Sequence, residues 1–312
     1  MKNSALPEKI YDVLIIGGGG AGLTAGLYTS RAKLSTVLLE KLTPGGQIAL
    51  TDVVENYPGF PEGITGPEIS NRMEEQAKRY GTEIRYEEVN GIEKKNQNFL
   101  IKTTEGVLNA RSIIVASGAS YRNLGIPRER ELTGHGVSYC ATCDGAFFKG
   151  KEIIVVGGGD SALQEGIFLT RFVPKLTVVH RRDKLRASPL LQERAFQNPK
   201  IKFQWDSVVT DLLGEKKVEG VKFKNLKTGE TSNFKTEGMF VFIGHDPNTA
   251  FLKGVVELDE KGYVKTGDNL ETSVPGIFAC GEVRAGAVKQ LVSCCGEGCE
   301  AALAAQAYVE KQ

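Results

Sequence analysis

The sequence predicts an α/β fold of two similar three-layer domains, the second inserted into the first. A short apolar run, a glycine-rich turn and a helical stretch follow one another twice, and the two turns begin at Gly17 and Gly157. After Asp246 there is no third turn of this kind, only one more apolar strand at 276–280 and a final alanine-rich helix. Strand, turn, helix and strand in this order form a βαβ unit, so each half is expected to be a Rossmann-like domain.

In the first half, residues 11–16 are expected to form a buried strand. The turn at Gly17–Gly22 then opens a helix to about Ala32, and residues 35–40 form the second strand. Two shorter strands are expected further on, at 99–103 and 112–117.

The second half repeats this order with a strand at 152–156, a turn at 157–162, a helix to about Phe172 and a strand at 176–180. Further strands are expected at 203–209, which contains Trp205, and at 221–223 and 239–243. The final helix is expected from about Gly298 to Val309, in a tail that returns to complete the first domain.

The composition is that of a globular protein with a sizeable core: 41% of the residues are hydrophobic, 25% are charged and the formal net charge is +1. Balanced charge argues against a nucleic-acid partner, and no apolar run approaches the roughly 18 residues of a membrane span. The N-terminus has no run long enough for a signal peptide, so we expect a cytoplasmic protein without a membrane partner. Glycine is in excess, at 37 of 312 residues, which indicates tight turns or close approach of backbone to a ligand.

Both glycine turns match the pattern G-x-G-x-x-G, which binds a dinucleotide when it follows a strand and opens a helix. The first glycine permits a tight turn, the second lets the backbone approach a pyrophosphate, and the third lets helix and strand pack closely. Free N–H groups at the helix start then face the phosphates. These positions are filled by Gly17, Gly19 and Gly22 in the first copy and by Gly157, Gly159 and Ala162 in the second.

The residue that ends the second strand distinguishes the two predicted sites. Glu40 lies about 20 residues after the first turn begins, where an acid hydrogen-bonds a ribose diol. The second copy has His180 at this place, followed by Arg181, Arg182 and Arg186. Arginines bind a 2′-phosphate by bidentate contacts, so the first site is predicted to bind FAD or NAD and the second NADP(H). A surface salt-bridge face is the alternative role for the arginines.

Between the two halves lies a C-x-x-C segment, Cys140–Cys143, followed by Asp144. Two thiols at this spacing can close a small disulfide, and Asp144 is a candidate general acid/base, with an N-cap or turn carboxylate as the alternative. A zinc site is the rival interpretation, with Cys294, Cys295 and Cys299 as possible further ligands. No second C-x-x-C accompanies them, so we predict a redox pair and no metal.

Together these motifs resemble those of the low-molecular-weight, bacterial-type thioredoxin reductases over essentially the whole chain. The segment Cys140-Ala-Thr-Cys-Asp144 is the most specific of them. The others are Gly17–Gly22, Pro44-Gly-Gly-Gln47, Glu55–Phe60, Gly157–Ala162, His180–Asp183 with Arg186-Ala187, and Gly244–Thr249. Flavin-dependent ferredoxin–NADP reductases of similar build lack the cysteine pair, which excludes them.

The resemblance implies a homodimer that passes electrons from NADPH through FAD to a Cys140–Cys143 disulfide and then to a thioredoxin-like protein. It places Cys143 against the flavin, makes Cys140 the thiol that attacks the partner disulfide, and gives Asp144 the role of proton donor. Because the dithiol must be buried for one step and exposed for the other, family members rotate one domain against the other.

The resemblance also divides the chain. Residues 1–118 and 246–312 would form a discontinuous FAD-binding domain, and residues 119–245 an NADPH-binding domain that carries the C-x-x-C. Hinges are expected near 118–121 and 244–246.

With the glycine motifs, the resemblance assigns the cofactor contacts residue by residue. For FAD they are Gly17, Gly19, Ala21, Gly22, Glu40, Gly45, Gly46, Gln47, Asn56, Val89, Gly118, Gly281, Glu282, Lys289 and Gln290. For NADPH they are Gly157, Gly159, Asp160, Ser161, Ala162, His180, Arg181, Arg182 and Arg186. Relatives usually have Asp and Arg where this chain has Glu282 and Lys289, which adds one methylene at the first position and removes a bidentate fork at the second.

The remaining cysteines, Cys280, Cys294, Cys295 and Cys299, are expected to pack as small apolar residues, with a second redox relay or a metal site as the alternatives. Two other functions stay open at this point. The same machinery could serve another protein acceptor or another electron donor, or the chain could be a non-enzymatic flavin- or zinc-binding protein with structural thiols.

Overall fold

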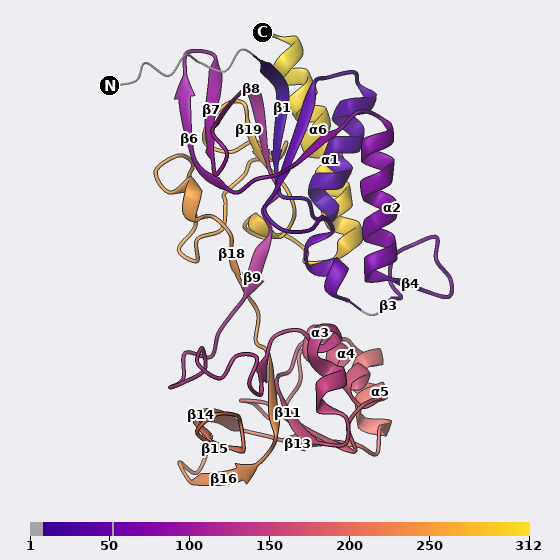
Figure 1. The fold of residues 1–312 in the computed structure, drawn as a ribbon, viewed down its shortest axis with the longest axis vertical. Coiled ribbons are helices and arrows are strands. Elements are labelled where there is room, and N and C mark those ends of the chain that lie inside the picture. Colours follow the sequence, from indigo (N-terminus) through magenta and orange to yellow (C-terminus); the bar gives the residue numbers. More distant parts are fainter. Residues whose placement is uncertain (1–8, 52) are drawn as a thin grey trace. The chain divides into compact units, whose positions relative to one another are not determined.

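The computed structural model describes residues 9–51 and 53–312, and the chain divides into two compact units. Unit 1 consists of Met1–Ser120 and Asp246–Gln312, and unit 2 of Tyr121–His245. The chain crosses between them twice, where β9 (Ala119–Tyr121) pairs with β18 (His245–Pro247) (Figure 1). Each unit contains a parallel sheet flanked by helices, so the predicted fold class of two Rossmann-like units is confirmed.

Unit 1 is built on a seven-stranded sheet in the order β5-β2-β1-β8-β7-β6, with β19 also paired to β8. The pairs among β1, β2, β5, β8 and β19 are parallel, whereas β6 and β7 form an antiparallel extension. The strands are β1 Ile10–Ile16, β2 Thr36–Glu40, β5 Glu83–Tyr86, β6 Val89–Lys95, β7 Asn98–Thr103, β8 Val107–Val115 and β19 Ile277–Ala279; a separate hairpin pairs β3 Val53–Val54 with β4 Ile64–Thr65.

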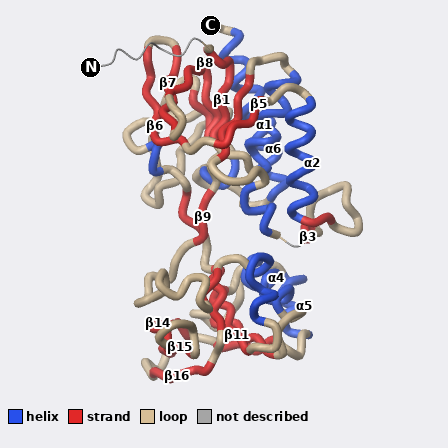
Figure 2. Tube along the Cα trace, in the orientation of Figure 1, coloured by secondary structure: helices blue, strands red, loops and turns tan. Residues whose placement is uncertain are grey.

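Three helices cover one face of this sheet (Figures 1 and 2). They are α1 Gly20–Arg31, α2 Gly66–Arg79 and α6 Leu291–Glu310. Side chains of β1 are buried on both faces: Val13 and Ile15 pack with α1 and α6, and Leu14 and Ile16 pack with β7 and the returning chain. Burial on both faces explains why β1 reads as a continuous apolar run.

The limits of α2 follow from its local sequence. The side chain of Thr65 accepts a hydrogen bond from the N–H of Glu68 at 3.2 Å, and Pro67 lies in the first turn. Lys78 lies in the last turn, where a cation is favourable to the helix dipole, and the chain leaves through Gly81 with φ of +108°.

Unit 2 contains a five-stranded parallel sheet in the order β10-β17-β11-β12-β13 and a three-stranded antiparallel sheet, β14-β15-β16. The strands are β10 Val137–Ser138, β11 Glu152–Gly157, β12 Lys175–Val179, β13 Ile201–Gln204, β14 Ser207–Leu213, β15 Gly220–Asn225, β16 Thr231–Lys235 and β17 Gly238–Phe242. The helices are α3 Ala141–Asp144, α4 Asp160–Leu169 and α5 Pro189–Gln197.

The two faces of the parallel sheet in unit 2 are covered differently. Val155 and Val178 pack with side chains of α4 and α5, whereas Ile154 and Met239 pack with β14 and β15. Unit 2 therefore has three layers: helices, parallel sheet and antiparallel sheet.

Two sequence-based expectations are wrong in detail. Helix α6 begins at Leu291 and not near Gly298, which lies inside the helix. A Cβ at Gly298 would lie 2.2 Å from the carbonyl oxygen of Ala21, so glycine is present here because it allows α6 to contact α1. The expected strand at 203–209 is two strands, because the chain turns at Asp206, which has φ of +51°.

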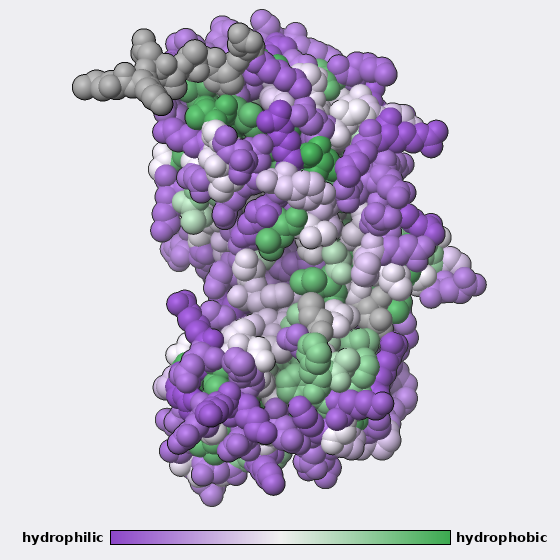
Figure 3. All heavy atoms as spheres, viewed as in Figure 1, coloured by the Kyte–Doolittle hydropathy of each residue, from purple (hydrophilic) through white to green (hydrophobic). Residues whose placement is uncertain are grey.

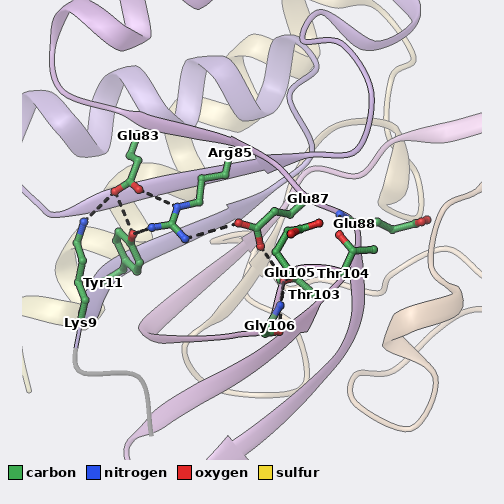
Figure 4. A network of polar contacts seen from close by, with 10 residues as sticks. All are labelled: Lys9, Tyr11, Glu83, Arg85, Glu87, Glu88, Thr103, Thr104, Glu105 and Gly106. Carbon is green, nitrogen blue, oxygen red and sulfur yellow. Dashed lines mark hydrogen bonds and ion pairs between the residues drawn. The ribbon is translucent and has the colours of Figure 1, made fainter.

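A polar network ties β1 to the edge strand β5 (Figure 4). The carboxylate of Glu83 accepts hydrogen bonds from Lys9 Nζ at 2.8 Å, Tyr11 Oη at 3.0 Å and Arg85 Nε at 2.7 Å. Partial burial opposes ionisation, but these donors outweigh it and lower the pKa of Glu83 to about 2. Arg85 also pairs with Glu87 at 3.6 Å, so the network extends to the loop that follows β5.

None of the helices in the described part of the chain has the length and apolar composition needed to cross a bilayer.

Candidate functional site

The first glycine turn joins β1 to α1 and leaves the start of that helix open. Gly17 has φ of +106°, and a Cβ there would lie 2.4 Å from the carbonyl oxygen of Ala116. A Cβ at Gly22 would lie 1.9 Å from the carbonyl oxygen of Gly17, so close helix–strand contact requires glycine here. At Gly19, the N-cap, a Cβ would meet no described atom within 4 Å, and no side chain caps the helix. Its first N–H groups can therefore receive an anion.

Glu40 ends β2 beside this turn and lines a cleft of about 460 Å³. Its carboxylate accepts hydrogen bonds from the N–H groups of Gly18 at 2.8 Å and Leu42 at 3.0 Å. Val89 lines the same cleft, as do residues 247–251 of the returning chain. The cleft lies at the carboxyl ends of parallel strands, where open α/β sheets bind their ligands.

The loop that contains Gly45 and Gly46 packs against the first turn. The N–H of Gly45 donates to the carbonyl of Gly18 at 2.7 Å, and both loop glycines have positive φ, +108° and +58°. The side-chain amide of Gln47 donates to the carbonyl of Ala119. Three of the predicted FAD residues are thus gathered beside the open helix start.

Segments that are far apart in sequence complete this side of unit 1. Asn56 Nδ2 donates to Gln290 Oε1 at 2.9 Å. Lys289 Nζ donates to Tyr263 Oη at 3.0 Å. Burial raises the pKa of the Glu282 carboxyl, an effect that the positive charge of Lys289 partly offsets.

The turn that carries Glu282 is held by α6. The N–H of Gly281, which has φ of +76°, donates to Glu297 Oε2 at 2.7 Å, and Arg284 Nη2 pairs with Glu297 Oε1 at 2.6 Å. This half-buried ion pair fixes the predicted flavin-side turn against the helix.

The second glycine turn joins β11 to α4 in the same way. A Cβ at Gly157 would lie 2.4 Å from the carbonyl oxygen of Phe242, and Gly159 is an N-cap without a side-chain hydrogen bond. Asp160, the first residue of α4, accepts a hydrogen bond from the N–H of Ser188 at 2.6 Å, while Ser161 is exposed in the same turn. The start of α4 can thus receive an anion as well.

His180 lies buried beneath the second turn. A Cβ at Gly158 would lie 2.3 Å from its Nδ1, and its Nε2 is 3.0 Å from the carbonyl oxygen of Lys184. Burial lowers the pKa of His180, and the positive charges of Arg186 and Arg181 lower it further. The neutral ring therefore supports the backbone of the turn.

The arginine cluster extends beyond this histidine into solvent. Arg181, Arg182 and Arg186 are all exposed, and none has an ion-pair partner among the described residues. The neighbouring acid, Asp183, pairs with Lys227 at 3.1 Å instead. Among the described residues, these arginines therefore do not form the salt-bridge face that was the alternative role.

The C-x-x-C segment begins one residue before α3 in unit 2. Cys140 is disulfide-bonded, and its carbonyl accepts a hydrogen bond from the N–H of Asp144 at 3.2 Å. Its N–H donates to Ser138 Oγ at 3.1 Å. The side chain of Cys143 lies outside the described part of the structure.

Comparison with known proteins decides the family. The family model described as pyridine nucleotide-disulphide oxidoreductase matches residues 11–306. The thioredoxin reductase of Bacillus subtilis is 51% identical over 305 residues, which cover 97% of this chain and 96% of that protein. The chain belongs to the thioredoxin reductase family.

Solved structures of this family agree with the fold. The thioredoxin reductase of Lactococcus lactis is 46% identical and matches with a TM-score of 0.95 over 97% of this chain and 100% of that one. The thioredoxin reductase of T. acidophilum is 36% identical, with a TM-score of 0.92 over 97% and 99% of the two chains. The chain is accordingly an oxidoreductase, and its cofactors are the FAD and NADPH that the family uses.

The two turns fit these cofactors on physical grounds. Both have an open helix start, and in both the glycine that begins the turn has no room for a side chain. A tight turn of this kind lets the backbone approach the pyrophosphate of a dinucleotide. Only the turn near Glu40 has a carboxylate at the end of its second strand, and only the turn near His180 is followed by exposed arginines.

Three of the extra cysteines pack in unit 1, as the sequence indicated, whereas Cys299 is half-buried and lines a second cleft. Cys280 and Cys294 lie in the apolar layer between the sheet and α6, and Cys295 packs with Leu291 and Val54. Burial raises the pKa of the Cys294 thiol to about 12 and also raises that of Cys280. Among the described residues, no three His, Cys, Asp or Glu side chains converge as metal ligands.

Sequence reasoning missed one exposed residue near the dithiol. Phe147 follows Asp144 closely in the chain and is 73% exposed. Figure 3 shows apolar side chains gathered on the face of unit 2 over α3 and α4. A single exposed phenylalanine does not belong to a periodic apolar pattern. Only its position shortly after the C-x-x-C in the sequence could have indicated a function.

Proposed function

We propose that the chain transfers two electrons from NADPH, by way of FAD and a Cys140–Cys143 disulfide, to the disulfide of a thioredoxin. The observation that carries the proposal is a disulfide-bonded Cys140 in a chain with two open dinucleotide turns. The curated relatives, which are named thioredoxin reductases, support the acceptor.

In this proposal, residues 1–118 and 246–312 bind FAD and residues 119–245 bind NADPH. Glu40 accepts hydrogen bonds from a ribose diol in the first site, and Val89 lies beside it in the same cleft. Arg181, Arg182 and Arg186 bind the 2′-phosphate in the second. When bound, the nicotinamide and the flavin supply a two-electron path that ends at the enzyme disulfide.

The chain's own thiols then carry out two exchange steps. The Cys140 thiol passes its proton to Asp144, and the thiolate attacks one sulfur of the thioredoxin disulfide to form a mixed disulfide; the sulfur that leaves takes that proton back from Asp144. The Cys143 thiol next gives up its proton and attacks the Cys140 sulfur, and the second thioredoxin sulfur leaves and takes up that proton. The Cys140–Cys143 disulfide is restored, and thioredoxin has gained two electrons and two protons.

We also propose that Phe147 forms part of the docking surface for thioredoxin, because it is an exposed aromatic side chain a few residues after the C-x-x-C segment in the chain. The chain crossings at 118–121 and 244–246 serve as hinges between the flavin step and the exchange step. A homodimer and a cytoplasmic location complete the proposal, on the family resemblance.

The test uses Cys140→Ser, with Cys299→Ser as the matched control. Cys140→Ser should reduce NADPH-dependent thioredoxin reduction to background while NADPH still bleaches the flavin, because only the exchange step needs the thiol. Cys299→Ser should keep both reactions. Full thioredoxin turnover in Cys140→Ser would contradict the mechanism.

A panel of electron donors and protein disulfides tests the rest of the assignment. NADPH and NADH are each supplied with thioredoxin, a glutaredoxin-like protein and a peroxiredoxin. We expect NADPH with thioredoxin to give the largest kcat/KM, and faster reduction of another acceptor would replace thioredoxin in the proposal.

A further inference from the structure

Tyr139 directly precedes Cys140, and its hydroxyl is tied into the interior of unit 2. It donates a hydrogen bond to Glu129 Oε1 at 2.6 Å. Glu129 is only 2% exposed and also accepts from the N–H groups of Leu124 and Gly125, each at 2.7 Å. A buried carboxylate with three donors is both satisfied and fixed in position.

The ring of Tyr139 is fixed as well. It packs with Leu124 and Ile126 against the apolar layer beneath the antiparallel sheet. Its ring centroid also lies 6.5 Å from that of Tyr121, at an interplanar angle of 28°. The tyrosine is therefore held at both its polar and its apolar parts.

The residue before Tyr139 is anchored by a different element. Ser138 belongs to β10 and pairs with Phe240 of β17. Its Oγ accepts from the N–H of Cys140 at 3.1 Å and donates to the carbonyl of Cys140 at 3.2 Å. Two successive anchors, Ser138 in the sheet and Tyr139 on Glu129, thus precede the first cysteine.

We propose that the Tyr139–Glu129 hydrogen bond is a positioning contact for the redox dithiol. It restrains the backbone at Cys140, and so limits the positions from which the sulfur of Cys140 can reach a second thiol. Thiols held near bonding geometry have a high effective concentration, which favours the disulfide over the dithiol. The inference rests on the proposed redox role of Cys140 and Cys143.

The measurable quantity is the exchange equilibrium with glutathione. The enzyme dithiol and one glutathione disulfide give the enzyme disulfide and two glutathione thiols, so both electrons and both protons pass to glutathione. Tyr139→Phe keeps the ring and removes the donor. We expect its constant for disulfide formation to fall about tenfold, which corresponds to a rise of about 30 mV in the reduction potential.

Two further variants make the test specific. Glu129→Gln keeps the size and one accepting oxygen, and it should shift the equilibrium in the same direction; it also serves as the test if Tyr139→Phe does not fold. Tyr308→Phe is the matched control, because the hydroxyl of Tyr308 has no hydrogen-bond partner among the described residues and its ring packs on Phe278 in unit 1. Its glutathione equilibrium should equal that of the parent.

A glutathione equilibrium within twofold of the parent in both Tyr139→Phe and Glu129→Gln would overturn the positioning role, whatever their melting temperatures. NADPH should bleach the flavin of both variants at the parent rate, since this step precedes the dithiol. The proposed function fails separately, if Cys140→Ser retains thioredoxin turnover.

Discussion

The two glycine turns have similar backbone arrangements, but the second strand of each βαβ unit is followed or ended by a side chain of a different kind. After the first turn, the Glu40 carboxylate accepts the N–H of Gly18 at 2.8 Å and remains at the edge of a cleft. After the second, the ring of His180 fills the equivalent place beneath Gly158, and the arginines that follow extend into solvent. In the proposed function, the turns receive a pyrophosphate and the residues at the end of the next strand select the nucleotide.

The turns also differ in how tightly helix and strand meet. In the first, a Cβ at Gly22 would lie 1.9 Å from a backbone carbonyl oxygen, which cannot move away. In the second, the same position is Ala162, and its Cβ is accommodated beside Gly157. The first helix therefore approaches its strand more closely than the second.

The largest effect is expected from Gly22→Ala. The added Cβ pushes α1 from the turn, and we expect a loss of about 3 kcal/mol in unfolding free energy together with loss of bound FAD. The free energy is measured by urea unfolding and the flavin by its absorbance after purification. Ala162→Gly is the counterpart in the second turn and should cost only about 1 kcal/mol. Equal effects of the two variants would show that the turns do not differ in this way.

The next largest effect is expected at the arginines that follow the second turn, and it tests whether this turn selects NADPH over NADH. Arg181→Ala, Arg182→Ala and Arg186→Ala each remove a charge-assisted contact of about 1.5 to 3 kcal/mol, so NADPH affinity should fall roughly tenfold to a hundredfold. Affinity for NADH, which has no 2′-phosphate, should stay the same. Both are measured by titration of the purified variants.

Lys224→Ala, which changes an exposed lysine of β15, controls for the loss of a positive charge in unit 2. An equal loss of NADH affinity in the arginine variants would remove the 2′-phosphate assignment.

The smallest effect concerns the pH dependence of stability. The pKa of His180 is lowered in the folded chain, so below the unfolded pKa of about 6.5 the unfolded state binds more protons. Stability should therefore fall as pH drops below about 6.5, by at most about 1.4 kcal/mol per pH unit, until the folded pKa is reached.

His180→Phe should remove this part of the slope, and urea midpoints between pH 5 and pH 8 measure it. Glu40→Gln, the change at the equivalent place in the first turn, should leave the slope in this range as it is in the parent. A parent-like slope in His180→Phe would show that other groups cause it.

The sequence was sufficient for the architecture because that architecture rests on local signals. Apolar runs such as 11–16 and the glycine turns at Gly17 and Gly157 predict strands, helix starts and duplication from neighbouring residues alone. Charge at the end of a strand, as at Glu40 and Arg181, follows from spacing within one βαβ unit.

What the sequence did not predict depends on contacts between distant segments. The final helix was expected to begin near Gly298, but this glycine lies inside α6, where it makes room for Ala21 of α1. The turn at Asp206 interrupts a run of strand-forming residues, and the pairing of β13 with β12 decides where that run ends. No motif links Tyr139 to Glu129, because the link is a half-buried hydrogen bond and not a spacing.

The central claim is that two similar turns hold two different nucleotides in one electron path. Its most direct test is the flavin absorbance of the purified chain as NADPH or NADH is added without oxygen. We expect a yellow protein that NADPH bleaches at a concentration at least tenfold below that needed with NADH, because only NADPH engages the arginine cluster. A flavin that stays oxidised with NADPH, or that NADH reduces equally well, would contradict the account.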